Sequence, residues 1–88
     1  MIIFENDDSG YLQWVNANPD GFVINAPKHP GSFPDMLHKA SCQHISTPQR
    51  TNYTTTDFKK ICSMSKEALT DWGHNNSENF QQCKHCSP

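Results

Sequence analysis

Apolar residues near the N-terminus recur at the spacing of an amphipathic helix. The positions concerned are Tyr11, Leu12, Trp14 and Val15. Ser9 precedes them and can cap the helix, and Asp7 and Asp8 suit the positive end of its dipole. Pro19 disfavours helical geometry at the residue before it. We therefore predict a helix that starts near Ser9 and ends within the sequence NANPDG.

Three further stretches are predicted strands. Their sequences are GFVINA, DMLHKA and FKKICS, at residues 21–26, 35–40 and 58–63. The first two are separated by PKHPGSFP, a loop rich in proline, so we expect them to pair antiparallel. The polar, turn-rich residues 43–57 are typical of a long surface loop.

A second helix is predicted after the third strand. Ser65 can cap KEALTDWG, where Ala68, Leu69 and Trp72 share one face and Gly73 can end the helix. The tail that follows is predicted to be a loop that ends with a pair of cysteines. The pattern as a whole predicts a small α+β fold, with a short antiparallel sheet flanked by two helices.

The size of the chain makes an additional source of stability necessary. The chain has 88 residues, of which 34% are hydrophobic, and it shows no repeat or linker, so we expect a single domain spanning 1–88. A domain of this size buries only about 60% of its unfolded surface, which gives marginal stability. The four cysteines can add stability as two disulfides or as ligands of a structural metal ion.

The cellular compartment decides between disulfides and a metal site. The N-terminal sequence MIIFENDD lacks the basic segment of a signal peptide, and no apolar run approaches the roughly 20 residues that span a bilayer. We therefore expect a cytoplasmic protein without membrane association. Thiols stay reduced there, and clustered cysteines bind metal. A preceding targeting segment would reverse this expectation.

Cys83 and Cys86 form a C-x2-C pair, a spacing that lets two thiolates reach one tetrahedral ion from a tight turn. Redox dithiols share this spacing, but they normally open a helix rather than follow a polar loop. His38 and Cys42 are the candidate second half of the site. Three thiolates and one imidazole form the closed ligand set of structural zinc. We predict a Zn²⁺ site made of His38, Cys42, Cys83 and Cys86.

Other cysteine and histidine residues are alternative ligands. Cys62 lies in an apolar strand and is expected in the core, but as a ligand it would displace His38. His44 and His85 lie beside predicted ligands and are second choices. The chain has no G-x-S-x-G, phosphate-loop or H-E-x-x-H motif, and four protein ligands leave no open position for water. We therefore expect that the protein is not an enzyme.

The stretches GFVINA, MLHKASC, KKICSMSKEAL and FQQCKHC together resemble the zinc-binding N-terminal domain of the bacterial Ada family of methyl-phosphotriester repair proteins. The likeness extends from about Trp14 to Cys86. It implies that Cys42, Cys83 and Cys86 fall on three of the four zinc ligand positions of that family. His38 stands at the fourth, where the family has the thiolate that accepts a methyl group from DNA. The resemblance implies a retained zinc site, a lost repair reaction and an association with DNA.

The net charge of −2 gives no general attraction to nucleic acid, but the middle of the chain is locally basic. Its candidate nucleic-acid-binding residues are Lys28, Lys39, Arg50, Lys59 and Lys60. Our first hypothesis is a small zinc-stabilised module that binds DNA or a nucleic-acid-processing protein. One alternative is a protein–protein adaptor or inhibitory protein that binds through Tyr11 and Trp14. Another is a DNA repair protein that accepts alkyl groups on Cys42 or Cys62.

Overall fold

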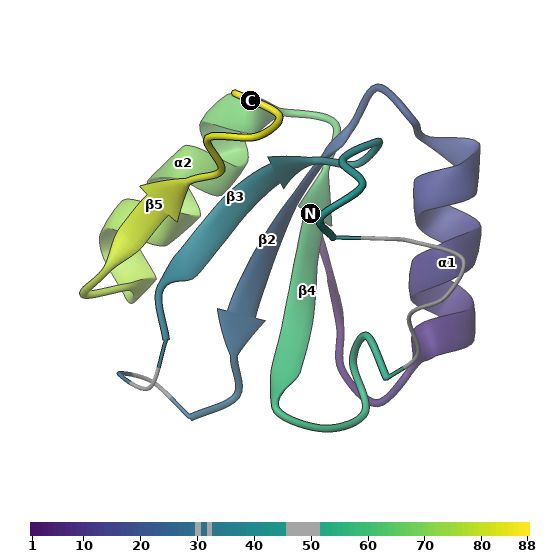
Figure 1. Cartoon of the computed structure of the whole chain (residues 1–88), viewed down its shortest axis with the longest axis horizontal. Helices are drawn as coiled ribbons and strands as arrows, with labels where there is room; N and C mark the ends of the chain where they lie inside the picture. The colour runs from purple at the N-terminus through teal and green to yellow at the C-terminus, as the bar shows by residue number, and fades with distance from the viewer. Residues whose placement is uncertain (30, 32, 46–51) are drawn as a thin grey trace.

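The computed structural model describes residues 1–29, 31, 33–45 and 52–88, which form a five-stranded sheet and two helices (Figure 1). The strands are β1 (Ile2–Phe4), β2 (Phe22–Pro27), β3 (Asp35–Lys39), β4 (Phe58–Ser63) and β5 (Phe80–Gln82). Their order across the sheet is β1-β4-β2-β3-β5. Neighbouring strands are antiparallel except β3 and β5, which are parallel. The predicted α+β class is confirmed, and the sheet is mixed rather than wholly antiparallel.

The two helices, α1 (Asp8–Ala17) and α2 (Lys66–Asn76), cover opposite faces of the sheet. The core under α1 contains Val23 of β2, whereas the core under α2 contains Ile24. Successive residues of a strand point to opposite faces, so the two cores lie on the two sides of one sheet. Each fully buried isoleucine or leucine stabilises the fold by about 1.5–3 kcal/mol.

The start of α1 differs from the prediction. The helix is capped by Asp7, whose carboxylate accepts a hydrogen bond from the amide of Gly10 over 2.9 Å. The prediction of Ser9 as the cap is therefore wrong by two residues. Aspartate and serine cap helices about equally well, so the local sequence does not separate them. The helix ends at Ala17, before Pro19, as predicted.

The start of α2 agrees with the prediction, and its end does not. The hydroxyl of Ser65 accepts a hydrogen bond from the amide of Ala68 over 3.1 Å, which confirms the predicted cap. The helix continues past Gly73 to Asn76. Gly73 is needed for packing, because a Cβ atom there would overlap the ring of Phe80. No helix in the described ranges is long and apolar enough to span a membrane.

The strands β1 and β5 are absent from the sequence prediction. Each has only three residues, and β5 exposes Gln81 and Gln82, so neither shows the alternation of a half-buried strand. β5 forms because α2 carries the chain back across the sheet to the free edge of β3. The connection β4-α2-β5 makes β5 parallel to β3. The carboxyl ends of β3 and β5 therefore lie side by side at the same end of the sheet.

Candidate metal centre

The parallel pairing of β3 and β5 brings two distant parts of the sequence together. Leu37 of β3 is paired with Gln82 of β5. One residue further on, the amide of Cys83 donates a hydrogen bond to the carbonyl oxygen of Leu37 over 2.8 Å. The ladder thus continues into the C-x2-C segment. Consequently Cys83 lies beside the end of β3, where His38 is located.

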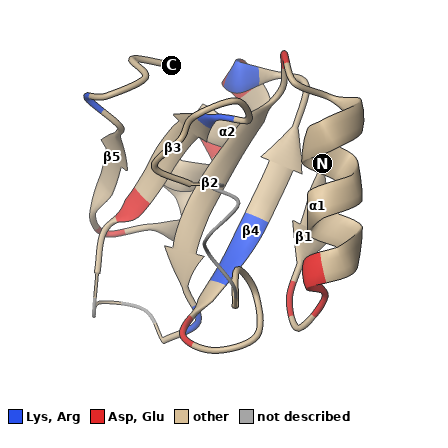
Figure 2. Cartoon of the chain, turned by 45° about the vertical axis from the view of Figure 1, so that its right-hand side comes forward, with Lys and Arg blue, Asp and Glu red and all other residues tan. Residues whose placement is uncertain are grey.

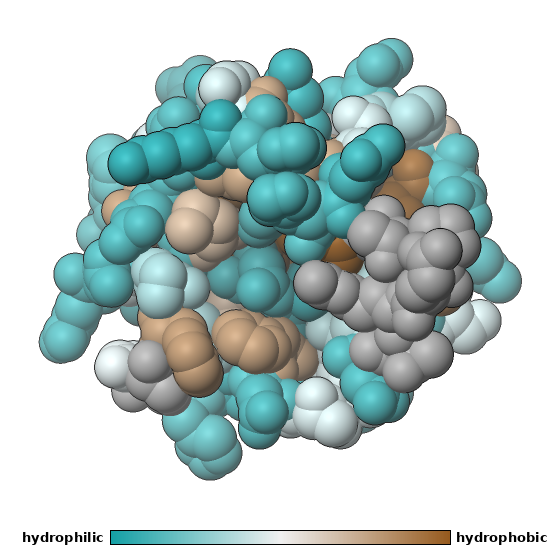
Figure 3. Space-filling view, viewed as in Figure 1, coloured by the Kyte–Doolittle hydropathy of each residue, from teal (hydrophilic) through white to brown (hydrophobic). Residues whose placement is uncertain are grey.

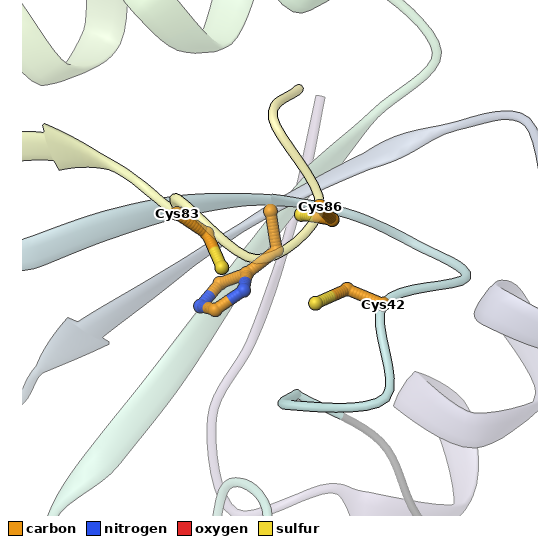
Figure 4. Close-up of side chains that lie close together, drawn as sticks. Cys42, Cys83 and Cys86 are labelled. Atoms are coloured by element: carbon orange, nitrogen blue, oxygen red, sulfur yellow. The ribbon is translucent and has the colours of Figure 1, made fainter.

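The structure clusters the four residues that the sequence predicts as ligands. One ligand atom from each of His38, Cys42, Cys83 and Cys86 lies within 4.8 Å of all the others. In a tetrahedral zinc site with bonds of about 2.0–2.3 Å, ligand atoms are about 3.3–3.8 Å apart, so no pair of these atoms exceeds that spacing by more than about 1–1.5 Å. Figure 4 shows Cys42 approaching from the turn after β3, and Cys83 and Cys86 from the chain after β5. The cluster could hold a metal ion.

Backbone hydrogen bonds and packing fix the turn that carries Cys42. The amide of Ala40 donates to the carbonyl oxygen of Gly21 over 2.9 Å, which ties the chain after β3 to the start of β2. The amide of Cys42 donates to the carbonyl oxygen of Lys39 over 3.0 Å. Three residues later, Ile45 is buried in the core under α1. The position of Cys42 is therefore determined by contacts on both sides of it.

Backbone N–H groups point at all three cysteine sulfurs of the cluster. The amide of Lys39 donates to the Sγ atom of Cys86 over 3.3 Å. The amide of His44 donates to the sulfur of Cys42, and the amide of Cys86 donates to that of Cys83. Such hydrogen bonds favour the thiolate form. They also orient ligands and moderate the charge of a metal site with several thiolates.

The thiols of the cluster differ in acidity. Burial raises the pKa of Cys42 to about 11, and the N–H of His44 offsets only part of this effect. Burial also acts to raise the pKa of Cys83, but the N–H groups of Cys86 and His85 and the neighbouring thiols outweigh it, so this pKa is lowered. Cys83 is therefore the thiol that loses its proton more readily. A metal ion held by this cluster would displace a proton from Cys42.

His38 supplies the nitrogen of the cluster. The side chain is buried, with 7% of the residue exposed. Its Nδ1 atom makes no hydrogen bond to the described residues, although His38 has other interactions. An imidazole nitrogen among three sulfur atoms is a donor set that zinc and related ions accept. The chemistry of the four groups thus fits a metal ion.

Cys62 is a core residue in the described structure. It is fully buried in β4 and packs in the core under α1. Burial raises the pKa of its thiol to about 12, against the opposing effect of the Lys60 charge. Cys62 is not a member of the four-residue cluster. The alternative in which Cys62 replaces His38 as a ligand therefore has no support from the geometry.

His44 and His85, the second-choice ligands, lie next to the cluster. Their rings stack on each other, with centroids 3.9 Å apart and planes inclined by 10°. Both are exposed. They border a shallow depression of about 350 Å³ that also reaches His38 and Cys83. The stacked pair lines the side of the cluster that opens to solvent.

The structure corrects the expectation that Lys60 contacts nucleic acid. Lys60 is 5% exposed. Its Nζ atom donates to Oδ1 of Asn25 over 2.6 Å and to the carbonyl oxygen of Tyr53 over 2.8 Å. The ammonium also lies 5.7 Å from the centroid of the Tyr11 ring. Lys60 therefore holds the chain at Tyr53 against the sheet and is not available to a phosphate group.

Of the other predicted nucleic-acid contacts, Lys28 and Lys59 lie at one end of the sheet and Lys39 lies at the opposite end. Lys28 donates to Oδ1 of Asn6 over 2.8 Å. Lys59 pairs with the end of β2, whereas Lys39 pairs with its start, so the two lie toward opposite ends of the sheet. Figure 2 shows the basic segments spread in this way. Arg50 lies outside the described residues.

No family model, no curated protein and no solved structure matches the chain. The resemblance to the Ada-type domain therefore stays a prediction from the sequence. The same holds for the DNA association and the lost repair reaction that this resemblance implies. The structure adds the geometry of the cluster.

Proposed function

We propose that this chain is a non-enzymatic binding module stabilised by one structural Zn²⁺ ion. The observation that carries the proposal is the cluster of four ligand atoms, all within 4.8 Å of one another. Three thiolates and one imidazole favour zinc over calcium, magnesium or manganese, which prefer oxygen ligands. Four protein ligands also complete a tetrahedron and leave no position for a reacting water.

A structural role follows from where the ligands lie in the chain. Cys42 precedes the long loop, and Cys83 and Cys86 belong to the C-terminal tail, so one ion would tie both segments to the end of β3. Zinc coordination supplies about 10 kcal/mol or more of folding free energy. That amount is comparable to the whole stability of a small domain. We therefore expect folding and zinc binding to be one equilibrium.

We infer that the partner of the module is a protein rather than a nucleic acid. Strong phosphate binding needs several cations on one surface. Lys60 is internal, and Lys39 and Lys59 lie toward opposite ends of the sheet. Titration with duplex DNA and with single-stranded RNA at low and high salt tests this inference. Binding that weakens steeply with salt would favour the nucleic-acid hypothesis instead.

Removal of the metal tests the structural role. Addition of a strong zinc chelator should abolish the helical circular dichroism signal and the cooperative melting transition, and added Zn²⁺ should restore both. A chelator saturated with zinc beforehand is the control and should change neither. If the chelated chain keeps its spectrum and melting temperature, the ion is not structural.

A further inference from the structure

Two exposed histidines lie beside the candidate metal centre without belonging to the four-residue cluster. His44 follows Cys42 by two residues, and His85 stands between Cys83 and Cys86. Their rings stack with centroids 3.9 Å apart, so this histidine pair joins the two segments that carry the thiols. The segments lie on the side of the sheet opposite α2, where Figure 3 shows a mainly hydrophilic surface of described residues.

A depression of about 350 Å³ connects the histidine pair with the cluster. Its lining includes both histidines and two of the four candidate ligands, His38 and Cys83. Cys42 instead packs in the core under α1. The volume is several times the roughly 30 Å³ that one water molecule occupies in the liquid, so the depression admits a chelating group of several atoms. A ligand that enters from solvent by this depression therefore reaches the cluster from the side of His38 and Cys83.

The histidine pair is the part of this lining that can bind a metal ion in passing. Imidazole nitrogen is a common zinc ligand. Lys84 also lines the depression, but an ammonium group has no lone pair to offer a cation. A metal ion binds an imidazole in the plane of the ring. Because the planes of His44 and His85 are inclined by only 10°, the two rings do not point at one ion, and each acts singly.

We propose that the histidine pair lets the folded chain pass its zinc ion to a small chelating molecule. One Zn–S bond, to Cys83, breaks as one bond forms to a nitrogen of His44 or His85, and the ion keeps its charge. Donor atoms of the chelator then replace the remaining protein ligands, and the freed thiolates take up protons from water. The proposal rests on the proposed function, since it needs the ion of that site. Without the pair, release would have to wait for the domain to unfold.

The rate of zinc transfer from the loaded chain to a zinc-sensitive pyridyl dye tests the proposal. The wild-type rate constant should rise with dye concentration, because the dye attacks the folded chain. In the double variant His44→Phe and His85→Phe the rate constant should fall at least about tenfold, since phenylalanine keeps stacked rings but has no nitrogen. His29→Phe is the matched control: His29 is exposed beyond the other end of β2 and should not affect the rate. A wild-type rate that does not depend on dye concentration, or equal rates in wild type and double variant, overturns the proposal.

A second double variant, His44→Ala and His85→Ala, covers the case in which phenylalanine blocks the depression or prevents folding. It widens the opening and should still slow the transfer, so faster transfer would show that the histidines shield the ion and would contradict the proposal. Both variants should keep the wild-type affinity for zinc, because a group that only speeds exchange acts equally on both directions. A matching loss of affinity would make the pair structural and overturn its role in transfer.

Zinc content measured before the dye is added separates this proposal from the proposed function. A chain that binds no zinc refutes the proposed function and, with it, the transfer. A chain with one zinc whose transfer rate does not depend on the histidines refutes the transfer alone.

Discussion

The amide of Cys83 donates a hydrogen bond to the carbonyl oxygen of Leu37 over 2.8 Å and extends the parallel ladder of β3 and β5 beyond its last strand pair. This contact places the C-x2-C segment next to His38. It exists only because α2 returns the chain to the edge of β3. The cluster of four candidate ligands is therefore a product of the strand order as much as of the residue spacing.

The cysteines should divide into two classes on substitution. Cys83→Ser and Cys86→Ser each remove a ligand and should abolish both zinc binding and cooperative folding. Cys62→Ala removes a buried sulfur from the core and should cost about 1–3 kcal/mol of unfolding free energy while one zinc stays bound. Urea unfolding and zinc analysis of the three variants provide the comparison. Equal loss from all three would make Cys62 a ligand.

Substitutions of histidine test the fourth ligand. His38→Ala should lower the affinity for zinc more than about 100-fold. Residues that only contact a ligand typically change this affinity by about 10–100-fold. His38→Cys should keep zinc and the fold, because thiolate and imidazole bind zinc at about 2.0–2.3 Å. His44→Ala is the control for a histidine beside the cluster. Competition titrations with a zinc-sensitive dye measure all three, and wild-type affinity in His38→Ala would exclude His38 as a ligand.

The sequence predicts those parts of the fold that carry a local signal. Hydrophobic spacing predicts both helices, and the strand-forming residues predict β2, β3 and β4. The caps show the limit of such signals. Ser65 caps α2 as predicted, but Asp7 rather than Ser9 caps α1, because both residue types satisfy the same amide groups.

The features that the sequence does not predict depend on tertiary contacts. β5 is held by its pairing with β3, and nothing in the sequence around Phe80 signals it. The burial of Lys60 depends on Asn25 and Tyr53, which approach it only in the folded chain. The four candidate ligands are predicted correctly as a group even though β5 is not predicted. This is possible because the spacing of cysteines that bind one ion follows from the chemistry of the ion and does not require knowledge of the strand order.

Gly73→Ala should destabilise the protein although alanine is the better helix former by about 1 kcal/mol. The added methyl group overlaps the ring of Phe80, and overpacking of this kind costs about 1–3 kcal/mol. Asn75→Ala in the same helix is the control, because Asn75 is exposed and the substitution should be neutral or slightly stabilising. Thermal melting compares them. A higher melting temperature for Gly73→Ala would show that Phe80 does not pack there.

Asp8→Asn should cost about 1–3 kcal/mol of unfolding free energy at pH 7. The carboxylate accepts hydrogen bonds from the amide of Thr54 over 2.6 Å, from its hydroxyl over 2.7 Å and from the amide of Tyr53 over 3.2 Å. Burial acts to raise the pKa of Asp8, but these hydrogen bonds and the Lys60 charge outweigh it, and the pKa is lowered. The stabilisation is therefore complete above the unfolded-state pKa of about 3.9 and is lost as the pH falls through the folded-state value.

Asp71→Asn is the matched control for that experiment. Asp71 is exposed on α2, and its substitution should change the unfolding free energy by less than about 0.5 kcal/mol. Urea unfolding at pH 7 with saturating zinc measures both variants. Equal effects of the two substitutions would mean that Asp8 does not anchor the chain at Tyr53 and Thr54.

Native mass spectrometry of the purified chain tests the central claim most directly, because it reports zinc stoichiometry and cysteine oxidation together. We predict one zinc ion per chain and a polypeptide mass that shows all four cysteines without disulfides. The ion should be lost in Cys86→Ser and retained in Cys62→Ala. A folded, zinc-free chain whose mass is lower by about four hydrogens, as two disulfides require, would contradict both the metal centre and the function proposed from it.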